Sequence, residues 1–104
     1  MSTIASATIT AQNTWTTPVK LIGNINISVA LASGAVGSLG GTTVTVQRST
    51  DNSTWRDVDT FTNSSEEVGF DAELIYYRAG VKTGEYTASV IVRLGTSPNG
   101  LVND

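Results

Sequence analysis

Apolar residues occupy every second position in one stretch of the chain, and this period of two restricts the possible folds more than any other feature. Between residues 24 and 31 the apolar members of one face are Ile25, Ile27, Val29 and Leu31. Successive side chains of a β-strand point to opposite faces, so the pattern predicts a strand with one buried face. The same alternation returns at residues 43–47, 74–81 and 86–94. No segment shows the period of a helix, so the sequence predicts an all-β protein.

Turn-forming residues separate these runs at spacings of about 8–12 residues, which is typical of a sandwich or a small barrel. A turn at residues 51–53 predicts a hairpin between strands at 44–48 and 55–61. Thr83 and Gly84 predict a second hairpin. We count seven or eight strands and predict a single antiparallel β-sandwich, Ig-like or jelly-roll-like, made of two sheets packed face to face.

The strand predicted at residues 55–61 breaks the period of two. Trp55 and Phe61 fall on one face of it, whereas Val58 points to the other. A bulge, or a twisted strand buried in part on both sides, would explain this change of parity.

One domain accounts for the 104 residues, because this length leaves no room for a second core. We expect the sandwich to occupy residues 1–95, with residues 1–12 as an N-terminal arm or edge strand and residues 96–104 as a polar C-terminal tail. The first residues lack a positively charged segment followed by a long apolar run, so we expect no secretory signal. No stretch approaches the ~18 apolar residues that a membrane-spanning helix requires.

Missing side-chain types argue against several classes of function. The chain contains no His and no Cys, which removes imidazole bases, thiolate nucleophiles and the common zinc ligands. Its net charge is −3, so no basic surface for nucleic acid is expected. Asp57 and Asp59 come nearest to a pair of catalytic carboxylates, and we interpret them as solvated charges that discourage strand addition at a sheet edge. We therefore expect no enzymatic activity, no cofactor, no metal and no membrane association.

Two loops contain residue types that occur in ligand sites. The turn at Asp51 has the oxygen donors of a calcium loop but lacks its glycine and its distal bidentate glutamate, which leaves at most an adventitious ion. The glycine-rich loop at residues 34–41 contains no Lys and leads into a strand, whereas a phosphate cradle needs a helix N-terminus. We interpret this loop as either a mobile connection or a segment that adapts to a neighbouring subunit, with Gly37 and Leu39 as candidate contacts.

The large aromatic residues fall into two groups. Trp55 and Tyr77 are expected to fill the core or its rim, as large aromatic side chains usually do in a small sandwich. Tyr76 faces opposite to Tyr77 and must leave the main core. Tyr76 and Trp15 are therefore candidates both for packing and for contact with a partner protein or a sugar.

Residues 44–58 read Val-Thr-Val-Gln-Arg-Ser-Thr-Asp-Asn-Ser-Thr-Trp-Arg-Asp-Val. This run resembles a segment of many small tailed-bacteriophage proteins, which read apolar-x-apolar-Gln-Arg-Ser, then a short turn and Thr-Trp. The resemblance continues in residues 77–80, 83–87 and 90–95 and covers about half of the chain. It implies a virion-associated β-domain on the head surface or in tail or fibre parts. Here Asn52 and Ser53 replace the glycine-rich turn that is usual in such proteins.

The resemblance implies scaffolding roles for the shared positions and hands over no catalytic residues. The hairpin and rim residues are Arg48, Trp55, Asp57, Tyr77 and Arg78. Trp55 is expected to seal the hairpin. The two arginines are expected to meet Asp57 or Glu73 across strands.

The leading hypothesis from the resemblance is a capsid decoration, or cement, protein that binds the outer head surface of a phage and stabilises the shell. It implies the major capsid protein as partner, a location on the capsid exterior after synthesis in the host cytoplasm, and a homo-oligomer, with a trimer following from head symmetry. The N-terminal strand could pair with a neighbour's sheet. Candidate partner contacts are Ile4, Ile9, Trp15, Gly37, Leu39 and Tyr76. The alternatives are a tail or fibre component and a carbohydrate-binding module for host recognition.

Overall fold

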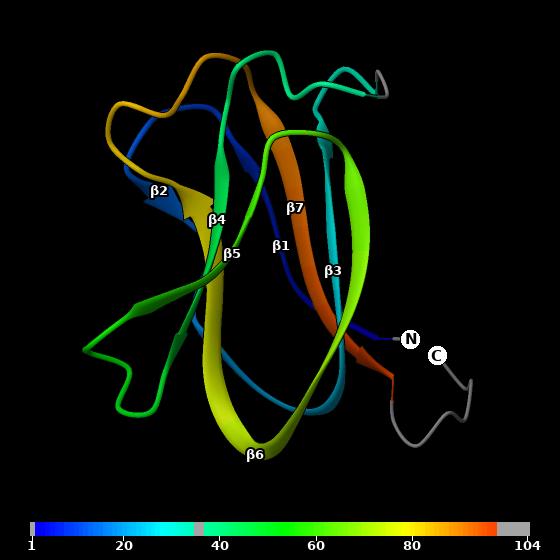
Figure 1. The fold of residues 1–104 in the computed structure, drawn as a ribbon, viewed down its shortest axis with the longest axis vertical. Coiled ribbons are helices and arrows are strands. Elements are labelled where there is room, and N and C mark those ends of the chain that lie inside the picture. The colour runs from blue at the N-terminus through cyan, green and yellow to red at the C-terminus, as the bar shows by residue number, and fades with distance from the viewer. Residues whose placement is uncertain (1, 35–36, 98–104) are drawn as a thin grey trace.

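Seven β-strands and their connections make up the part of the chain that the computed structural model describes, residues 2–34 and 37–97 (Figure 1). Side chains are described for all of these except residues 2–4 and 97. The strands are β1 (Ser2–Ile9), β2 (Thr14–Trp15), β3 (Val19–Leu31), β4 (Val44–Ser49), β5 (Arg56–Phe61), β6 (Ser65–Val81) and β7 (Val90–Ser97). Every strand pair among the described residues is antiparallel, so the predicted all-β antiparallel class is confirmed.

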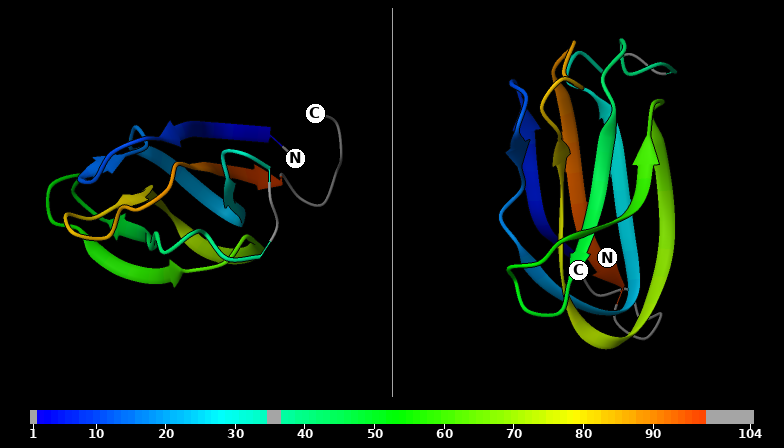
Figure 2. Two further views of the ribbon diagram at one scale, coloured as in Figure 1. Left: turned by 90° about the horizontal axis from the view of Figure 1, so that it is seen from above. Right: turned by 60° about the vertical axis from the view of Figure 1, so that its left-hand side comes forward.

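The strands form one continuous sheet in the order β1-β7-β3-β6-β4-β5, and β2 pairs with the end of β6. The sheet folds over on itself, so that its two ends face one another as two layers in a molecule of 36 × 30 × 17 Å (Figure 2). The sequence predicted two separate sheets instead. The two layers remain joined because β3 and β6, with 13 and 17 residues, are long enough to run through both.

Both long strands bend at the same level. The register of β3 against β6 shifts there, because Leu21 is opposite Ile75 whereas Gly23 is opposite Asp71. Gly23 has a φ of 80°, a left-handed conformation that glycine adopts without steric strain. A bulge of this kind bends a strand and increases its twist. The first half of β6 therefore lies in the layer of β1 and β7, and its second half lies in the layer of β4 and β5.

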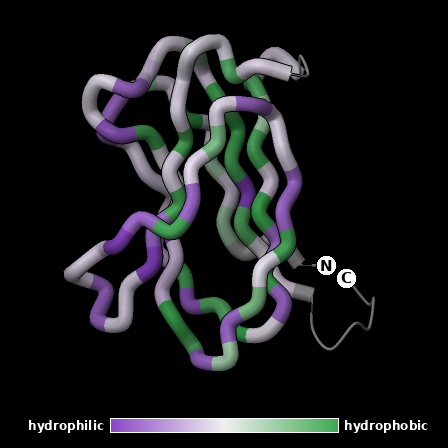
Figure 3. The backbone as a smooth tube through the Cα atoms, in the orientation of Figure 1, coloured by the Kyte–Doolittle hydropathy of each residue, from purple (hydrophilic) through white to green (hydrophobic). Residues whose placement is uncertain are grey.

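The core lies between the layers and is built from the alternating residues of the strands. Most of the residues predicted to face inward on β3, β6 and β7 are buried: Ile25, Ile27, Val29, Ile75, Tyr77, Ala79, Val81, Val90, Val92 and Leu94. Leu31, at the end of β3, is only half-buried. Figure 3 shows hydrophobic stretches of the inner strands running through the middle of the molecule. Full burial of one Val, Leu or Ile side chain stabilises a fold by about 1.5–3 kcal/mol. The period of two thus identified most of the residues that hold the layers together.

The hairpin predicted around residues 51–53 is present, because β4 and β5 pair antiparallel on either side of it. The predicted bulge is also present, and Val58 is the extra residue on β5. Since a bulge reverses the alternation of faces, Phe61 is buried in the core whereas Trp55 faces the outside of its layer. The prediction that Trp55 and Phe61 share a face is therefore wrong.

The second predicted hairpin, at Thr83 and Gly84, does not form. A local turn exists there, because the amide of Glu85 donates a hydrogen bond to the carbonyl of Lys82 at 3.1 Å. However, β6 and β7 do not pair, and β3 lies between them in the strand order. The segment after β6 crosses from one layer to the other. The turn was predictable from local chemistry, whereas the choice of partner strand was not.

The glycine-rich loop after β3 is anchored to the body of the domain. The side chain of Leu39 is fully buried, and its amide donates to the carbonyl of Thr62 at 2.9 Å. The hydroxyl of Thr42 donates to the carbonyl of Ala88 at 2.8 Å. Of the two interpretations of this loop, a freely mobile connection is therefore wrong for the residues around Leu39 and Thr42.

The first and last strands, β1 and β7, lie side by side in one layer. β1 is the end strand of the sheet and pairs along its length with β7 of the same chain. β7 runs to Ser97, past the predicted domain boundary at residue 95. The rest of the predicted tail, residues 98–104, lies outside the described residues.

Candidate functional site

An arginine lies between two tryptophans on the outer face of the β4–β5 layer. The guanidinium carbon of Arg78, on β6, is 4.3 Å from the ring centroid of Trp15 on β2 and 4.4 Å from that of Trp55 in the β4–β5 loop. A cation over an aromatic face is attracted by the ring quadrupole, by about 0.5–2 kcal/mol. All three side chains are half-buried. The stack therefore ties β2 and the hairpin loop to β6 from the outside.

A glycine makes this stack possible. Gly80 lies opposite Trp15 in the pairing of β2 with β6. A Cβ atom at Gly80 would be 2.2 Å from the carbonyl oxygen of Thr14 and 2.7 Å from the Cα of Trp15. Only a residue without a side chain lets β2 lie this close to β6. The Tyr-Arg-Ala-Gly run of the sequence thus combines the cation of the stack with the gap that admits the indole.

A chain of polar contacts extends from the stack across the same face. The Nε of Arg78 donates to Oε1 of Gln47 at 2.8 Å, and the Nε2 of Gln47 donates to Oδ1 of Asp57 at 2.8 Å. The ammonium of Lys82 donates to the other oxygen of Asp57. Lys82, and then Gln47, lower the pKa of Asp57, and burial lowers the pKa of Arg78. The expected contact between Arg78 and Asp57 or Glu73 is wrong, because Gln47 stands between Arg78 and Asp57.

A second network lies on the inner side, where the two halves of β6 meet. Arg48 binds the carboxylate of Asp71 at two points, through Nε at 2.8 Å and Nη2 at 3.1 Å. The hydroxyl of Tyr77 donates a third hydrogen bond to Asp71 at 2.7 Å. The contact with Arg48, and then that with Tyr77, holds the pKa of Asp71 at about 2. Burial, and then the Asp71 carboxylate, raises the pKa of Tyr77 to about 12.

The prediction that Arg48 contacts Asp57 or Glu73 is therefore also wrong. The reason for Asp57 is that it lies on the other face of the sheet. Arg48 is opposite Tyr77, whose side chain is buried between the layers. Asp57 is opposite Gln47 on the outer face. The two residues are separated by the thickness of the sheet, which cross-strand spacing in the sequence could not reveal.

The turn of the β4–β5 hairpin is held by one carboxylate. Oδ1 of Asp51 accepts hydrogen bonds from the amide of Ser53 at 2.9 Å, the amide of Thr54 at 2.8 Å and the hydroxyl of Ser49 at 2.9 Å. The amides of Thr54 and Ser53, in that order, lower the pKa of Asp51 to about 2. An Asp at the first position of such a loop shapes the turn by bonding to its main chain. The oxygens that resembled the start of a calcium loop thus serve the turn.

The predicted partner contacts do not form one surface. Ile9 and Leu39 are fully buried in the core, so the prediction that they contact a partner is wrong. Trp15 and Tyr76 are half-buried, and the ammonium of Lys20 lies 5.0 Å from the ring centroid of Tyr76. Gly37 is exposed. The side chain of Ile4 lies outside the described residues, although its backbone belongs to β1.

The most exposed apolar surface lies elsewhere, on the first half of β6. We call residues 65–71 of β6 the open edge. It pairs with β3 on one side, and no strand of the described residues pairs with its other side. Val68 and Phe70 are 72% and 71% exposed, the highest values among the large exposed hydrophobic residues. Nothing in the sequence indicated that both apolar side chains would stay outside the core.

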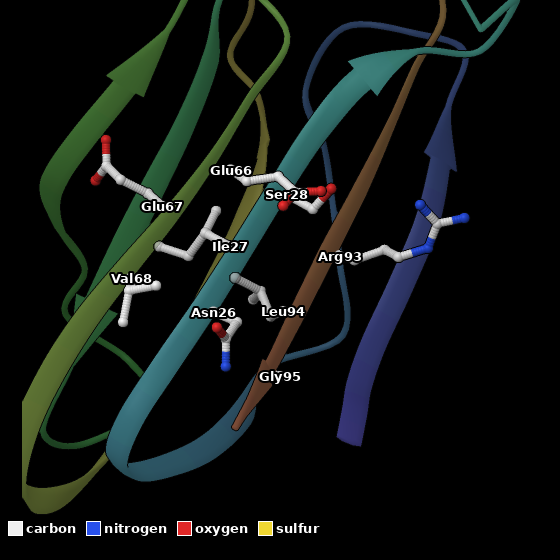
Figure 4. Close-up of a pocket in the computed structure, with 9 residues that line it drawn as sticks. All are labelled: Asn26, Ile27, Ser28, Glu66, Glu67, Val68, Arg93, Leu94 and Gly95. Atoms are coloured by element: carbon white, nitrogen blue, oxygen red, sulfur yellow. The ribbon is translucent and has the colours of Figure 1, made fainter. Parts of the chain in front are cut away.

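A pocket of about 360 Å³ adjoins the open edge (Figure 4). Its lining comes from three adjacent strands, β3, β6 and β7: Asn26, Ile27, Ser28, Glu66, Glu67, Val68, Arg93, Leu94 and Gly95. Ser28 is paired with Glu66 on one side and Arg93 on the other. In Figure 4 the Arg93 side chain extends toward β1, away from Glu66 and Glu67. The pocket therefore has an acidic side, at the open edge, and a basic side.

A second acidic contact lies at the open edge. The carboxyl group of Asp59 on β5 interacts with that of Glu67 and raises the pKa of Glu67. Glu67 is opposite Ile27 and Asp59 is opposite Val46, so both residues point to the inner side of their layers. Two carboxyl groups this close favour the protonated form of one of them. Acidic groups thus collect between β5 and the open edge.

Comparison with known proteins gave no match to any protein-family model, curated protein or solved structure. Residues 2–34 and 37–97 contain no helix that is long and apolar enough to span a bilayer. Within these residues there is also no group of three or more acidic side chains arranged to hold a metal ion.

Proposed function

We propose that this chain is a structural protein of a bacteriophage virion, acting as a capsid decoration protein that binds the outer surface of the head. The proposal is supported by the role that the residues carrying the resemblance have in the fold. Arg48 binds the carboxylate of Asp71, and Arg78 binds Gln47 and stacks against Trp55 and Trp15. These contacts connect strands that are distant in the sequence. These positions build a rigid scaffold, which is what a protein that works by docking requires.

The open edge supports the same proposal. A scaffold held by two polar networks carries a strand segment that pairs on one side only among the described residues and has two protruding apolar side chains. Large exposed apolar patches on soluble domains mark surfaces that bind another molecule. The implied partner is the major capsid protein, and the implied location is the exterior of the virion. Binding in a symmetric copy number, such as a trimer, follows from the symmetry of a head.

The test is cosedimentation of the purified full chain with expanded heads that lack it. We expect the protein to sediment with the heads, to saturate at hundreds of copies, and to raise the temperature at which the shells open. An unrelated acidic β-domain of similar size serves as the control. Saturation at a handful of copies would favour the tail or fibre alternative, and absence from the pellet would overturn the placement on the head.

A further inference from the structure

The open edge has the features of a strand that awaits a partner strand. An edge strand presents unpaired amides and carbonyls, and natural proteins protect such an edge with charged side chains, lysine above all, with proline or with a bulge. Residues 65–71 read Ser-Glu-Glu-Val-Gly-Phe-Asp, with neither Lys nor Pro. The register of this segment against β3 is regular from Gly23 to Val29. In Figure 1 it is the light-green strand at the right margin of the molecule.

The side chains of the open edge define what kind of strand fits it. Val68 is opposite Asn26 and Phe70 is opposite Asn24, so both apolar groups lie on the outer face of the layer. Glu67 points to the inner side, where it meets Asp59. Side chains of neighbouring strands pair on the same face. An added strand therefore meets Val68 and Phe70, with Glu66 beside them, on its outer face, and the carboxylates of Glu67 and Asp59 on its inner face.

Charge excludes a second copy of this chain as the natural occupant. The open edge contains Glu66, Glu67 and Asp71 and no cation. Asp71 is neutralised by Arg48, but Glu66 and Glu67 of two copies would bring four carboxylates to one interface with no cation from either open edge. Like charges on directly paired strands are destabilising. An incoming strand that carries lysine or arginine on its inner face would instead relieve the contact between Glu67 and Asp59.

We propose that the open edge of β6 binds an extended segment of a partner protein by strand addition, and that this segment alternates apolar residues with basic ones. Its backbone pairs with residues 66–70, its apolar side chains cover Val68 and Phe70, and its basic side chains lie beside Glu67 and Asp59. In this mode the backbone hydrogen bonds provide much of the affinity, and the alternate side chains provide the selectivity. The inference deepens the proposed function, on which it rests for the identity of the partner.

The test uses the full chain and two labelled peptides, one alternating valine with lysine and one alternating valine with glutamate. Binding is measured by fluorescence anisotropy, and the site is located by amide chemical shifts. We expect the lysine peptide to bind, to bind at least about tenfold more tightly than the glutamate peptide, and to weaken with added salt. The largest shift changes are expected at residues 65–71.

A matched pair of variants locates the edge. Val68→Lys places a charge in the middle of the open edge. Val58→Lys makes the same change at an exposed valine of β5, the end strand of the other layer. We expect Val68→Lys to weaken binding of the lysine peptide by about tenfold or more, and Val58→Lys to leave it within about twofold. Because each residue is at least half-exposed, both variants are expected to fold. Circular dichroism checks this.

Several outcomes would overturn the inference. They are equal binding of the two peptides, no binding of the lysine peptide, loss of binding in Val58→Lys alone, and a dimer of the free protein that Val68→Lys abolishes. Cosedimentation separates this failure from that of the proposed function. If Val68→Lys leaves sedimentation with heads unchanged, the open edge is not the binding surface, and the decoration role is retained. Peptide binding without sedimentation with heads would support the strand-addition site and contradict the decoration role.

Discussion

The two halves of β6 belong to one strand but lie in opposite surroundings. The second half, residues 75–81, pairs with β3 and β2 on one side and with β4 on the other. The first half, the open edge, pairs with β3 alone among the described strands. Ile75, Ala79 and Val81 are buried, whereas Val68 and Phe70 protrude. The difference shows that one strand can serve as a scaffold at one end and as a binding surface at the other.

The halves also differ in how their polar groups are used. Arg78 and Tyr77 of the second half are bound into two networks that reach β2, β4 and the hairpin loop. At the open edge, the carboxyl group of Glu67 is in contact with that of Asp59 instead of a cation. Paired polar groups stabilise a rigid region, whereas like charges in contact leave a region receptive to an oppositely charged partner. Asp71 marks the boundary between the two.

The sharpest test of this difference compares the two glycines of β6. Gly80→Ala should lower the free energy of unfolding by about 3 kcal/mol, because the new methyl group collides with β2. Gly69→Ala is the matched control, since nothing lies within 4 Å of a Cβ at that position. It should change stability by less than about 0.5 kcal/mol. Urea unfolding of both variants measures this, and equal losses would contradict the division of the strand.

The boundary can be tested through pH. The pKa of Asp71 is lowered from 3.8 to about 2 in the fold, so its stabilisation is present above pH 3.8 and is lost as the pH falls through about 2. This shift corresponds to about 2 kcal/mol for a carboxylate that is largely buried. We expect Asp71→Asn to be less stable than the parent protein by about 2 kcal/mol near neutral pH.

The difference between Asp71→Asn and the parent should shrink as the pH approaches 2, because only the parent protein loses the charged form. Thermal unfolding of both proteins across this pH range measures the change. A difference that stays constant with pH would show that the salt bridge with Arg48 does not provide the stability assigned to it.

The smallest effect is expected at the open edge itself. Phe70→Ala removes a large apolar side chain, a change that costs about 3–5 kcal/mol in a core. Because Phe70 is largely exposed, we expect a loss of less than about 0.5 kcal/mol. Urea unfolding checks this value. A loss of more than about 2 kcal/mol would mean that Phe70 packs as part of the fold, and it would remove the apolar surface from the proposed binding site.

Sequence reasoning reached parts of most strands, the β4–β5 hairpin and its bulge, because these depend on neighbours in the chain. It failed where partners came from distant segments. Arg48 was paired with the wrong carboxylates, Thr83 and Gly84 were assigned to a hairpin, and Ile9 and Leu39 were placed on the surface although they are buried. The open edge was missed because Val68 and Phe70 have the same alternation as buried residues.

By itself, the sequence determined that this chain is all-β, which faces of its strands are apolar, and where its tightest turn lies. Alternation and turn chemistry are local, so the order of residues is enough to specify them. Only the tertiary structure decided that β3 and β6 bend through both layers and that Arg78 lies between two indoles. It also decided that no other strand of residues 2–34 and 37–97 pairs with the free side of the first half of β6. The alternation of apolar residues shows only that one face of a strand is apolar. Whether that face is buried depends on which strands arrive beside it, and that is set by the packing of the whole chain.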